Sequence, residues 1–273
     1  MTTAMPAGAC DCHVHVYDTS RPLAASATFK PPHAPWSAYR EVQRALGLSR
    51  VVLVQPTGYG LDNSVLLEAL ALAGDAARGV AVLPADVSDG ELQRLHALGV
   101  RGVRFMMLAG AGGVLPWSAL PAMAHRIAPL GWHINLQLDG RHLSQHRQMI
   151  DALPCGVVID HTGKFIEPVP LDDPSFRTLL SVLERPQRWI KLSAPYETSK
   201  VGPPHYDDVS SLAQALLRAH PDRCLWASNW PHPNRNPVPS DAAMLALLDA
   251  WTGGDRALHD RVLSTNPAAL YGF

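Results

Sequence analysis

The chain has 273 residues, 47% of them apolar and 17% charged, with a formal net charge of −1 at pH 7, so it is long enough for one large core or two ordinary domains. A net charge near zero gives no electrostatic case for nucleic acid or an anionic membrane, and we expect neither as a partner. No apolar run approaches the roughly 20 residues that span a bilayer, and the first residues lack the features of a signal peptide, so the sequence predicts a cytoplasmic protein.

Short apolar runs alternate with helical patterns along the whole chain. The predicted strands are residues 11–16, 51–55, 79–83, 100–105, 132–138, 156–160, 189–193 and 223–228. The predicted helices are residues 37–46, 63–74, 89–98, 116–130, 141–153, 175–183, 207–220, 240–251 and 255–263. Ser37 is expected to cap the first helix, and Thr265 to cap a last helical turn with Pro267 at its first position.

Eight strand and helix units in about 250 residues match the arithmetic of a TIM (β/α)8 barrel, an α/β fold. We therefore predict one domain over residues 1–273, with an N-terminal extension at 1–8 and a Pro-rich lid loop at 18–36. The competing fold is a doubly wound open sheet. No G-x-G-x-x-G sequence follows the first strand to bind a dinucleotide, which disfavours that alternative.

The four cysteines lie in or beside apolar strand-like runs, at Cys10, Cys12, Cys155 and Cys224. None of them shows C-x-x-C spacing. The sequence therefore predicts reduced, buried thiols.

Two histidines lie close together on the first predicted strand. Because side chains alternate between the faces of a strand, Asp11, His13 and His15 are predicted to share one face. In a parallel barrel that face is the lumen, and a His-X-His pair at the carboxyl end of a strand lies where barrels carry out chemistry. The alternative is two polar residues on an edge strand, satisfied by water.

Closure of the barrel would bring together the polar residues that end the other strands, because parallel strands present their carboxyl ends at one rim. Polar residues at the ends of apolar strands cost desolvation unless they have partners or a function. The predicted rim residues are His13, His15, Gln55, Thr57, Arg104, Gln137, His161, Ser193, Asn229 and His232.

Five motifs carry a resemblance to a known family: Asp-Cys-His-Val-His at 11–15, Val-Arg-Phe at 103–105, Ile-Asp-His-Thr-Gly at 159–163, Leu-Trp-Ala-Ser-Asn-Trp-Pro-His-Pro at 225–233 and Thr-Asn-Pro-Ala-Ala-Leu-Tyr at 265–271. In this order they resemble the amidohydrolase superfamily, and within it the 2-pyrone-4,6-dicarboxylate lactonases and related sugar-lactone hydrolases. The resemblance runs from about residue 9 to the C-terminus. It implies a TIM barrel and hydrolysis of a cyclic ester or a related carbonyl compound.

The resemblance also implies roles for individual residues. His13 and His15 match the histidine pair of the first strand, His161 matches a histidine of the sixth, and Arg104 matches an arginine that binds a substrate carboxylate. Asn229 stands where the family has an aspartate, its general base. An amide cannot accept a proton at neutral pH, so either His161 or another histidine is the base, or the chain is an inactivated variant, or it has turned to binding or other chemistry.

A second departure concerns metal binding. Metal-dependent relatives present a histidine where this chain has Gln137, and His13 with His15 alone would make a poor chelate. We therefore expect no required metal, with weak zinc binding at His13 and His15 as the alternative. The histidines would then polarise the scissile carbonyl as hydrogen-bond donors.

Substrate recognition departs as well. The dicarboxylate lactonases use tyrosines and a second arginine, where this chain has Phe29, Gln137 and the region of Gly110. The expected substrate is a smaller or less charged lactone with one anionic group held by Arg104 and Lys164. Thr57, Gln137 and His232 complete the predicted substrate site.

Three functional hypotheses remain at this stage. The first is a hydrolase of a small lactone, with Asn229 and His161 orienting the water. The second is a catalytically silent barrel that binds such a ligand, and the third is a mononuclear zinc hydrolase. Lys191 lies mid-strand and is interpreted as part of a salt bridge within the barrel. A homo-oligomer is left open.

Overall fold

The computed structural model describes residues 5–273 and contains eight parallel strands that pair in sequence order. They are β1 (Cys10–Val14), β2 (Arg50–Val54), β3 (Ala77–Ala81), β4 (Val100–Met106), β5 (His133–Gln137), β6 (Gly156–Ile159), β7 (Arg188–Leu192) and β8 (Cys224–Trp226). All eight overlap predicted strands, and the predicted TIM barrel is confirmed. Residues 1–4 of the predicted N-terminal extension lie outside the described part of the chain.

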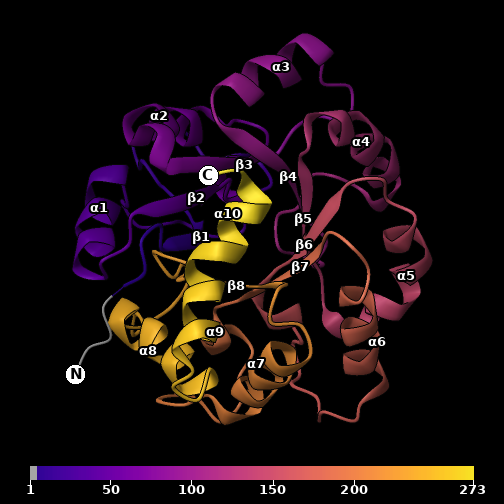
Figure 1. Cartoon of the computed structure of the whole chain (residues 1–273). Coiled ribbons are helices and arrows are strands. Elements are labelled where there is room, and N and C mark those ends of the chain that lie inside the picture. The colour runs from indigo at the N-terminus through magenta and orange to yellow at the C-terminus, as the bar shows by residue number, and fades with distance from the viewer. Residues whose placement is uncertain (1–4) are drawn as a thin grey trace.

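The helices surround the strands, and the last one crosses an end of the barrel (Figure 1). They are α1 (Trp36–Ala45), α2 (Ser64–Ala73), α3 (Asp89–Ala97), α4 (Leu120–Ile127), α5 (Leu143–Asp151), α6 (Pro174–Leu183), α7 (Asp207–Ala219), α8 (Asp241–Trp251), α9 (Arg256–Asp260) and α10 (Asn266–Tyr271). Their order along the chain confirms the predicted alternation of strands and helices.

Two predicted helix caps are wrong. α1 begins at Trp36, so Ser37 lies inside the helix and Pro35 occupies the cap position without a side-chain hydrogen bond. Thr265 has helical backbone angles because a π-helical turn, Arg261–Thr265, joins α9 to α10. Pro267 is therefore the second residue of α10 rather than the first.

β1 contains an irregularity that changes which side chains enter the lumen. Its register against β2 shifts between Asp11 and Val14, where β1 has one more residue than its partner. Cys10 and Cys12 therefore pack in an apolar cluster inside the barrel, while Asp11 bonds to Tyr39 of α1. The prediction that Asp11 shares a face with His13 and His15 is wrong, because a β-bulge resets the alternation of side chains.

The seam between β1 and β8 closes the barrel through hydrogen bonds rather than a regular ladder. The His15 amide donates to the Trp230 carbonyl at 2.8 Å, and the Asn229 amide donates to the His13 carbonyl at 3.1 Å. Asp11 strengthens this seam by accepting from the amide and the hydroxyl of Ser228, at 3.0 and 2.5 Å. The seam thereby fixes the two ends of the sequence that carry His13, His15 and Asn229.

The lumen is layered. Its apolar layer contains Cys10, Cys12, Val52, Val80 and Leu225, and α10 contributes Tyr271 to the same cluster. All four cysteines are free and buried, which confirms the predicted thiols, and burial raises the pKa of Cys155 to about 11. Toward the carboxyl ends of the strands, polar side chains replace the apolar ones, and the candidate active site lies at that end of the barrel.

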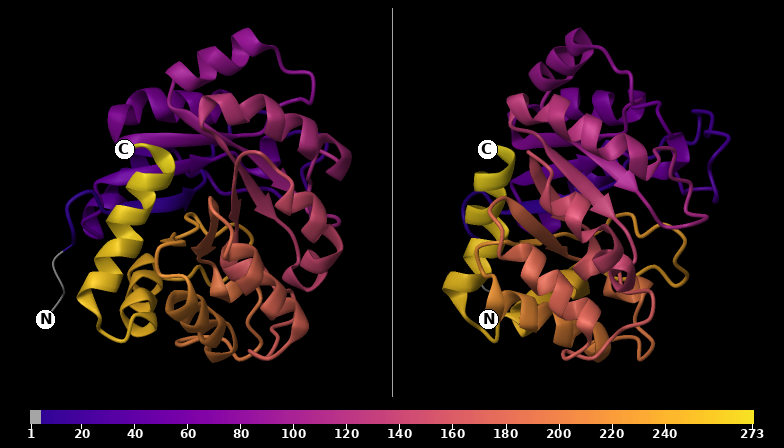
Figure 2. Two further views of the ribbon diagram at one scale, coloured as in Figure 1. Left: turned by 45° about the vertical axis from the view of Figure 1, so that its right-hand side comes forward. Right: turned by 90° about the vertical axis from the view of Figure 1, so that its right-hand side faces the viewer.

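The predicted lid segment forms a loop pinched at its base, where Tyr17 and Ala34 exchange backbone hydrogen bonds of 2.8 and 2.9 Å. The turned view in Figure 2 places this indigo loop and the yellow C-terminal helix at opposite ends of the barrel. Movement of the loop as a lid stays a prediction. Across residues 5–273, no helix has the length and apolar character needed to cross a membrane.

Candidate active site

A cavity of about 270 Å³ opens at the carboxyl ends of the strands. Thr28 and Phe29 of the loop cover part of it, and Tyr17 contributes from the base of that loop. The predicted site residues that line it are His15, Thr57, Arg104, Gln137, His161, Lys164 and Asn229. A larger cavity of about 510 Å³ shares Leu108 and Ala111 with it but contains none of these seven side chains.

The two histidines of β1 bond to each other, with 3.2 Å between their Nε2 atoms. His15 Nδ1 lies 2.7 Å from the Val54 carbonyl oxygen, which can only accept, so Nδ1 carries the proton and Nε2 of a neutral His15 accepts from His13. His13 Nδ1 is then an acceptor, and Lys191 Nζ donates to it at 3.1 Å. Burial lowers the pKa values of His13 and His15 well below the usual range for histidine, so both rings are neutral.

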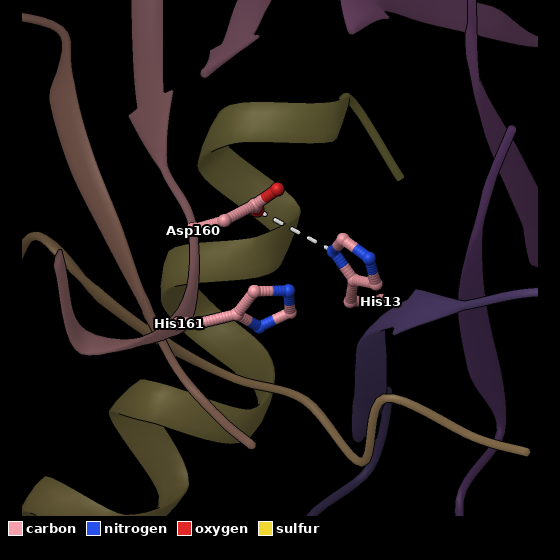
Figure 3. A group of neighbouring side chains, drawn as sticks. All are labelled: His13, Asp160 and His161. Carbon is pink, nitrogen blue, oxygen red and sulfur yellow. Dashed lines mark ion pairs between the residues drawn. The ribbon is translucent and has the colours of Figure 1, made fainter. Parts of the chain in front are cut away.

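A buried ion pair lies behind these rings. Lys191 Nζ lies 3.3 Å from Asp160 Oδ1 and donates to Asn135 Oδ1 at 2.5 Å, while Asn135 Nδ2 donates to Asp160 Oδ2 at 2.6 Å. Asp160 Oδ1 also lies 3.4 Å from His13 Nδ1 (Figure 3). Burial alone would raise the pKa of Asp160, but the Lys191 ammonium group holds it well below its usual range. The interpretation of Lys191 as a salt-bridge residue is confirmed.

A metal ion is the obvious alternative occupant of this region, because ligand atoms of His13, Asp160 and His161 lie within 4.8 Å of one another. Asp160, however, is the one carboxylate in the group, and it is already paired with Lys191. A divalent cation here would lie beside a buried ammonium group and be held by two neutral rings. These residues do not fit a divalent metal.

His161 differs from the other two histidines because one of its ring nitrogens is unengaged. Its Nδ1 lies 2.8 Å from the Ser193 hydroxyl oxygen, and Nε2 has no hydrogen-bond partner among residues 5–273. Burial lowers the pKa of His161 well below its usual range. With Ser193 donating to Nδ1, the neutral ring presents an Nε2 proton to the cavity.

Arg104 forms the positive wall of the cavity. Its Nη1 donates to the Gln55 carbonyl and its Nη2 to Gln137 Oε1, both at 2.8 Å, and the buried Nε has no hydrogen-bond partner among residues 5–273. A guanidinium group has five donors, so several stay free for a ligand. Gln137 therefore orients Arg104 as well as lining the cavity.

Sequence reasoning missed Glu197, which also lines the cavity. Glu197 ends a short 3-10 turn, Pro195–Glu197, just beyond β7, and forms an ion pair with Lys164. Asn229 Nδ2 donates to Glu197 Oε1 at 3.3 Å and to the Tyr196 hydroxyl at 2.9 Å. The position of Glu197 after the seventh strand was the signal available in the sequence.

His232, predicted to bind substrate, lies behind the cavity wall. Its Nδ1 lies 2.8 Å from the Tyr196 hydroxyl and its Nε2 2.8 Å from Asp241 Oδ1. It is not among the cavity-lining residues. The geometry gives His232 a contact with Tyr196 in place of one with substrate.

Comparison with known proteins adds three findings. The Amidohydrolase family model matches residues 10–273. The chain is 34% identical to a 2-pyrone-4,6-dicarboxylate hydrolase from Comamonas testosteroni, with 98% of this chain and 91% of that protein covered, and 32% identical to a D-galactarolactone isomerase from Agrobacterium fabrum, with 98% and 92% covered. A crystal structure of an Agrobacterium tumefaciens protein without ligand superposes with a TM-score of 0.90 at 31% identity, covering 99% of this chain and 97% of that one.

Proposed function

Because the chain belongs to the amidohydrolase family, we propose that it hydrolyses a small lactone that carries one anionic group. The observation that carries this proposal is the pairing, in one cavity of about 270 Å³, of free guanidinium donors on Arg104 with an unengaged Nε2 on His161. The first group suits a carboxylate and the second suits an ester carbonyl. The relatives named above act on lactones by their descriptions, which supports this substrate class.

Arg104 and Lys164 give the cavity positive charge, while Glu197 is the acidic residue that lines it. Because Lys164 is already paired with Glu197, Arg104 is the cation with donors to spare. One anionic group fits this arrangement better than two. Phe29, Thr57 and Tyr17 also line the cavity and would contact the lactone ring.

Carbonyl polarisation falls mainly to His161. His13 and His15 bond to each other, so their donors are engaged when no substrate is present. An Nε2 proton on His161 would stabilise the negative charge that develops on the carbonyl oxygen during attack. One such donor contributes about 10²-fold or more in rate.

We further propose that the reaction requires no metal, because Lys191 supplies the positive charge next to Asp160 that a cation would otherwise supply. Zinc analysis of the purified protein should give far less than one equivalent, and a chelator should leave activity unchanged. Stoichiometric zinc together with loss of activity on chelation would support the zinc-hydrolase alternative.

A cytoplasmic location is proposed on the cysteines. All four are free and buried, which suits a reducing compartment. The protein should therefore keep its activity in millimolar reductant.

Assay of a panel of five- and six-membered lactones, with and without a ring carboxylate, tests the function. We expect turnover of the carboxylate-bearing lactones, which can be measured by the release of acid as the ring opens. If no lactone is hydrolysed but the same compounds raise the melting temperature, the chain is the catalytically silent binder.

A further inference from the structure

The cavity needs a group that takes a proton from water, and Asn229 cannot do so because an amide is not basic at neutral pH. We infer that Glu197 is the general base of this site and that Asn229 positions both Glu197 and the attacking water. This inference rests on the lactone hydrolysis proposed above. The base is then a residue on the turn that follows β7 and not Asn229, which follows β8.

The position of Glu197 suits a base. It follows β7 on the turn Pro195–Glu197, at the carboxyl end of the barrel, and lines the same cavity as Asn229 and His161. Its side chain is only 14% exposed. A carboxylate at such a place is reachable by a water molecule in the cavity and is shielded from bulk solvent.

The side-chain amide of Asn229 holds the Glu197 carboxylate through a hydrogen bond. Nδ2 has two donors, and they go to Glu197 Oε1 and to the Tyr196 hydroxyl. Its Oδ1 thus stays available to accept from water. An aspartate at position 229 would place a carboxylate oxygen where Nδ2 lies 3.3 Å from Glu197 Oε1, and two like charges would then face each other.

Lys164 is the positioning partner of Glu197. Its side chain is 9% exposed, and its ammonium group pairs with the Glu197 carboxylate. An adjacent positive charge favours the ionised carboxylate, the form that can accept a proton. Burial lowers the pKa of Lys164, with Arg235 and Arg104 adding to the shift, whereas Asp160 opposes it.

His161 is a weaker candidate for the base. Its Nδ1 is engaged with Ser193, and its Nε2 is needed as the donor to the carbonyl. His13 and His15 are engaged with each other and with Lys191 and Val54. Each of these histidines would have to give up a hydrogen bond or a donor role in order to accept a proton. Glu197, which lines the cavity, would not lose such a histidine contact and is therefore the better base.

The step balances in atoms and charge. The water oxygen bonds to the lactone acyl carbon while Glu197 takes one water proton, and the carbonyl electron pair moves to the oxygen that faces His161. Collapse of the tetrahedral intermediate breaks the bond between the acyl carbon and the ring oxygen. Glu197 returns the proton to that oxygen, which leaves a hydroxy acid and the starting carboxylate.

Three variants and a surface control test the inference, assayed on a lactone that the wild-type protein turns over. Glu197→Gln should lower kcat by about 10²-fold or more and abolish the acidic limb of the kcat/KM pH profile. Asn229→Asp should lower kcat and move the acidic limb to higher pH, because the two carboxylates would share a proton. The double variant E197Q/N229D should recover at least about tenfold over E197Q, because the basic carboxylate has moved to position 229.

The matched control is Glu167→Gln, which removes an exposed carboxylate paired with Lys200 and lies outside the cavity. It should behave as wild type, and circular dichroism should show that all variants are folded. A wild-type kcat in folded E197Q, or a gain of activity in N229D with no effect of E197Q, overturns this inference but leaves the proposed lactone hydrolysis standing. A wild-type protein that hydrolyses none of the lactones overturns the proposed function and this inference with it.

Discussion

Arg104 combines burial with unused donors, and this combination gives it a measurable role in substrate choice. Within the described part of the chain, its guanidinium group forms two hydrogen bonds, to Gln55 and Gln137. Arg104→Lys keeps the charge but loses the planar fork that binds a carboxylate through two bonds. We expect kcat/KM for carboxylate-bearing lactones to fall roughly 30-fold, corresponding to about 2 kcal/mol for a charge-assisted bond.

A neutral lactone of the same ring size is the matched control for this prediction. Its kcat/KM should change little, because it presents no carboxylate to the lost donors. Equal losses on both substrates would mean that Arg104 supports the cavity wall and does not recognise the anion.

Lys191 and Asp160 form a fully buried pair, and removal of one partner leaves the other charge uncompensated. Lys191→Met should lower the free energy of unfolding by about 3–5 kcal/mol. Adding Asp160→Asn should restore part of the loss, which urea denaturation can measure. Lys200→Met, at an exposed pair, should cost less than about 1 kcal/mol, and a double variant as unstable as the summed singles would contradict the coupling.

The sequence predicted much of the site at this scale but not all of it. Polar residues at strand ends, such as Arg104 and His161, follow from the rule that parallel strands share a rim. Glu197 was missed because it lies on a turn beyond its strand, where alternation no longer applies. Asp160 was passed over within a recognised motif because its partner, Lys191, is distant in the sequence.

At the scale of elements, Asp11 joins β1 to β8 and to α1, and its titration should change stability. Burial raises the pKa of Asp11 from its ordinary value of 3.8 to about 6, despite the hydrogen bonds it accepts. Between these values the folded state binds more protons than the unfolded state, so this carboxyl destabilises the fold as pH rises from 4 to 6. The shift of about two pKa units corresponds to roughly 3 kcal/mol.

Asp11→Asn isolates this contribution, because an amide does not titrate. The unfolding free energy of the wild type minus that of Asp11→Asn should fall from pH 4 to pH 6 and then level off. Urea titrations at several pH values measure it. A difference that stays flat, or moves in favour of the wild type as pH rises, would show that the hydrogen bonds from Ser228 and Tyr39 outweigh burial.

The strands were more predictable than the details of their ends. Each apolar run gave a strand because burial on both sides favours β-branched and aliphatic residues. The bulge in β1 was not predictable, since it depends on pairing with β2 and not on local composition. The caps at Ser37 and Thr265 failed for a similar reason: Pro35 occupies the cap position and α1 begins at Trp36, and α9 continues through a π-turn into α10.

At the scale of the whole molecule, one end of the barrel contributes to stability and the other carries the cavity. A substitution at the end opposite the cavity should therefore lower stability without lowering catalysis. α10 and the last residues cover the amino ends of the strands, where Arg78 Nη2 donates to the Gly272 carbonyl at 2.7 Å. The Phe273 ring lies beneath Arg78 and Arg50, at 4.7 and 5.0 Å from their guanidinium carbons. Residues at this end of a barrel support the fold, whereas those at the carboxyl ends carry chemistry.

Phe273→Ala should therefore lower the free energy of unfolding by about 1–2 kcal/mol, from two cation–π contacts of about 0.5–1 kcal/mol each, and leave kcat/KM for the lactone unchanged. Arg78→Ala should also destabilise, and the double variant should cost less than the sum of the single variants because the two side chains interact. Urea denaturation and steady-state kinetics on the same preparations provide both readouts. A loss of kcat/KM that tracks the loss of stability would mean that the two ends of the barrel are energetically coupled.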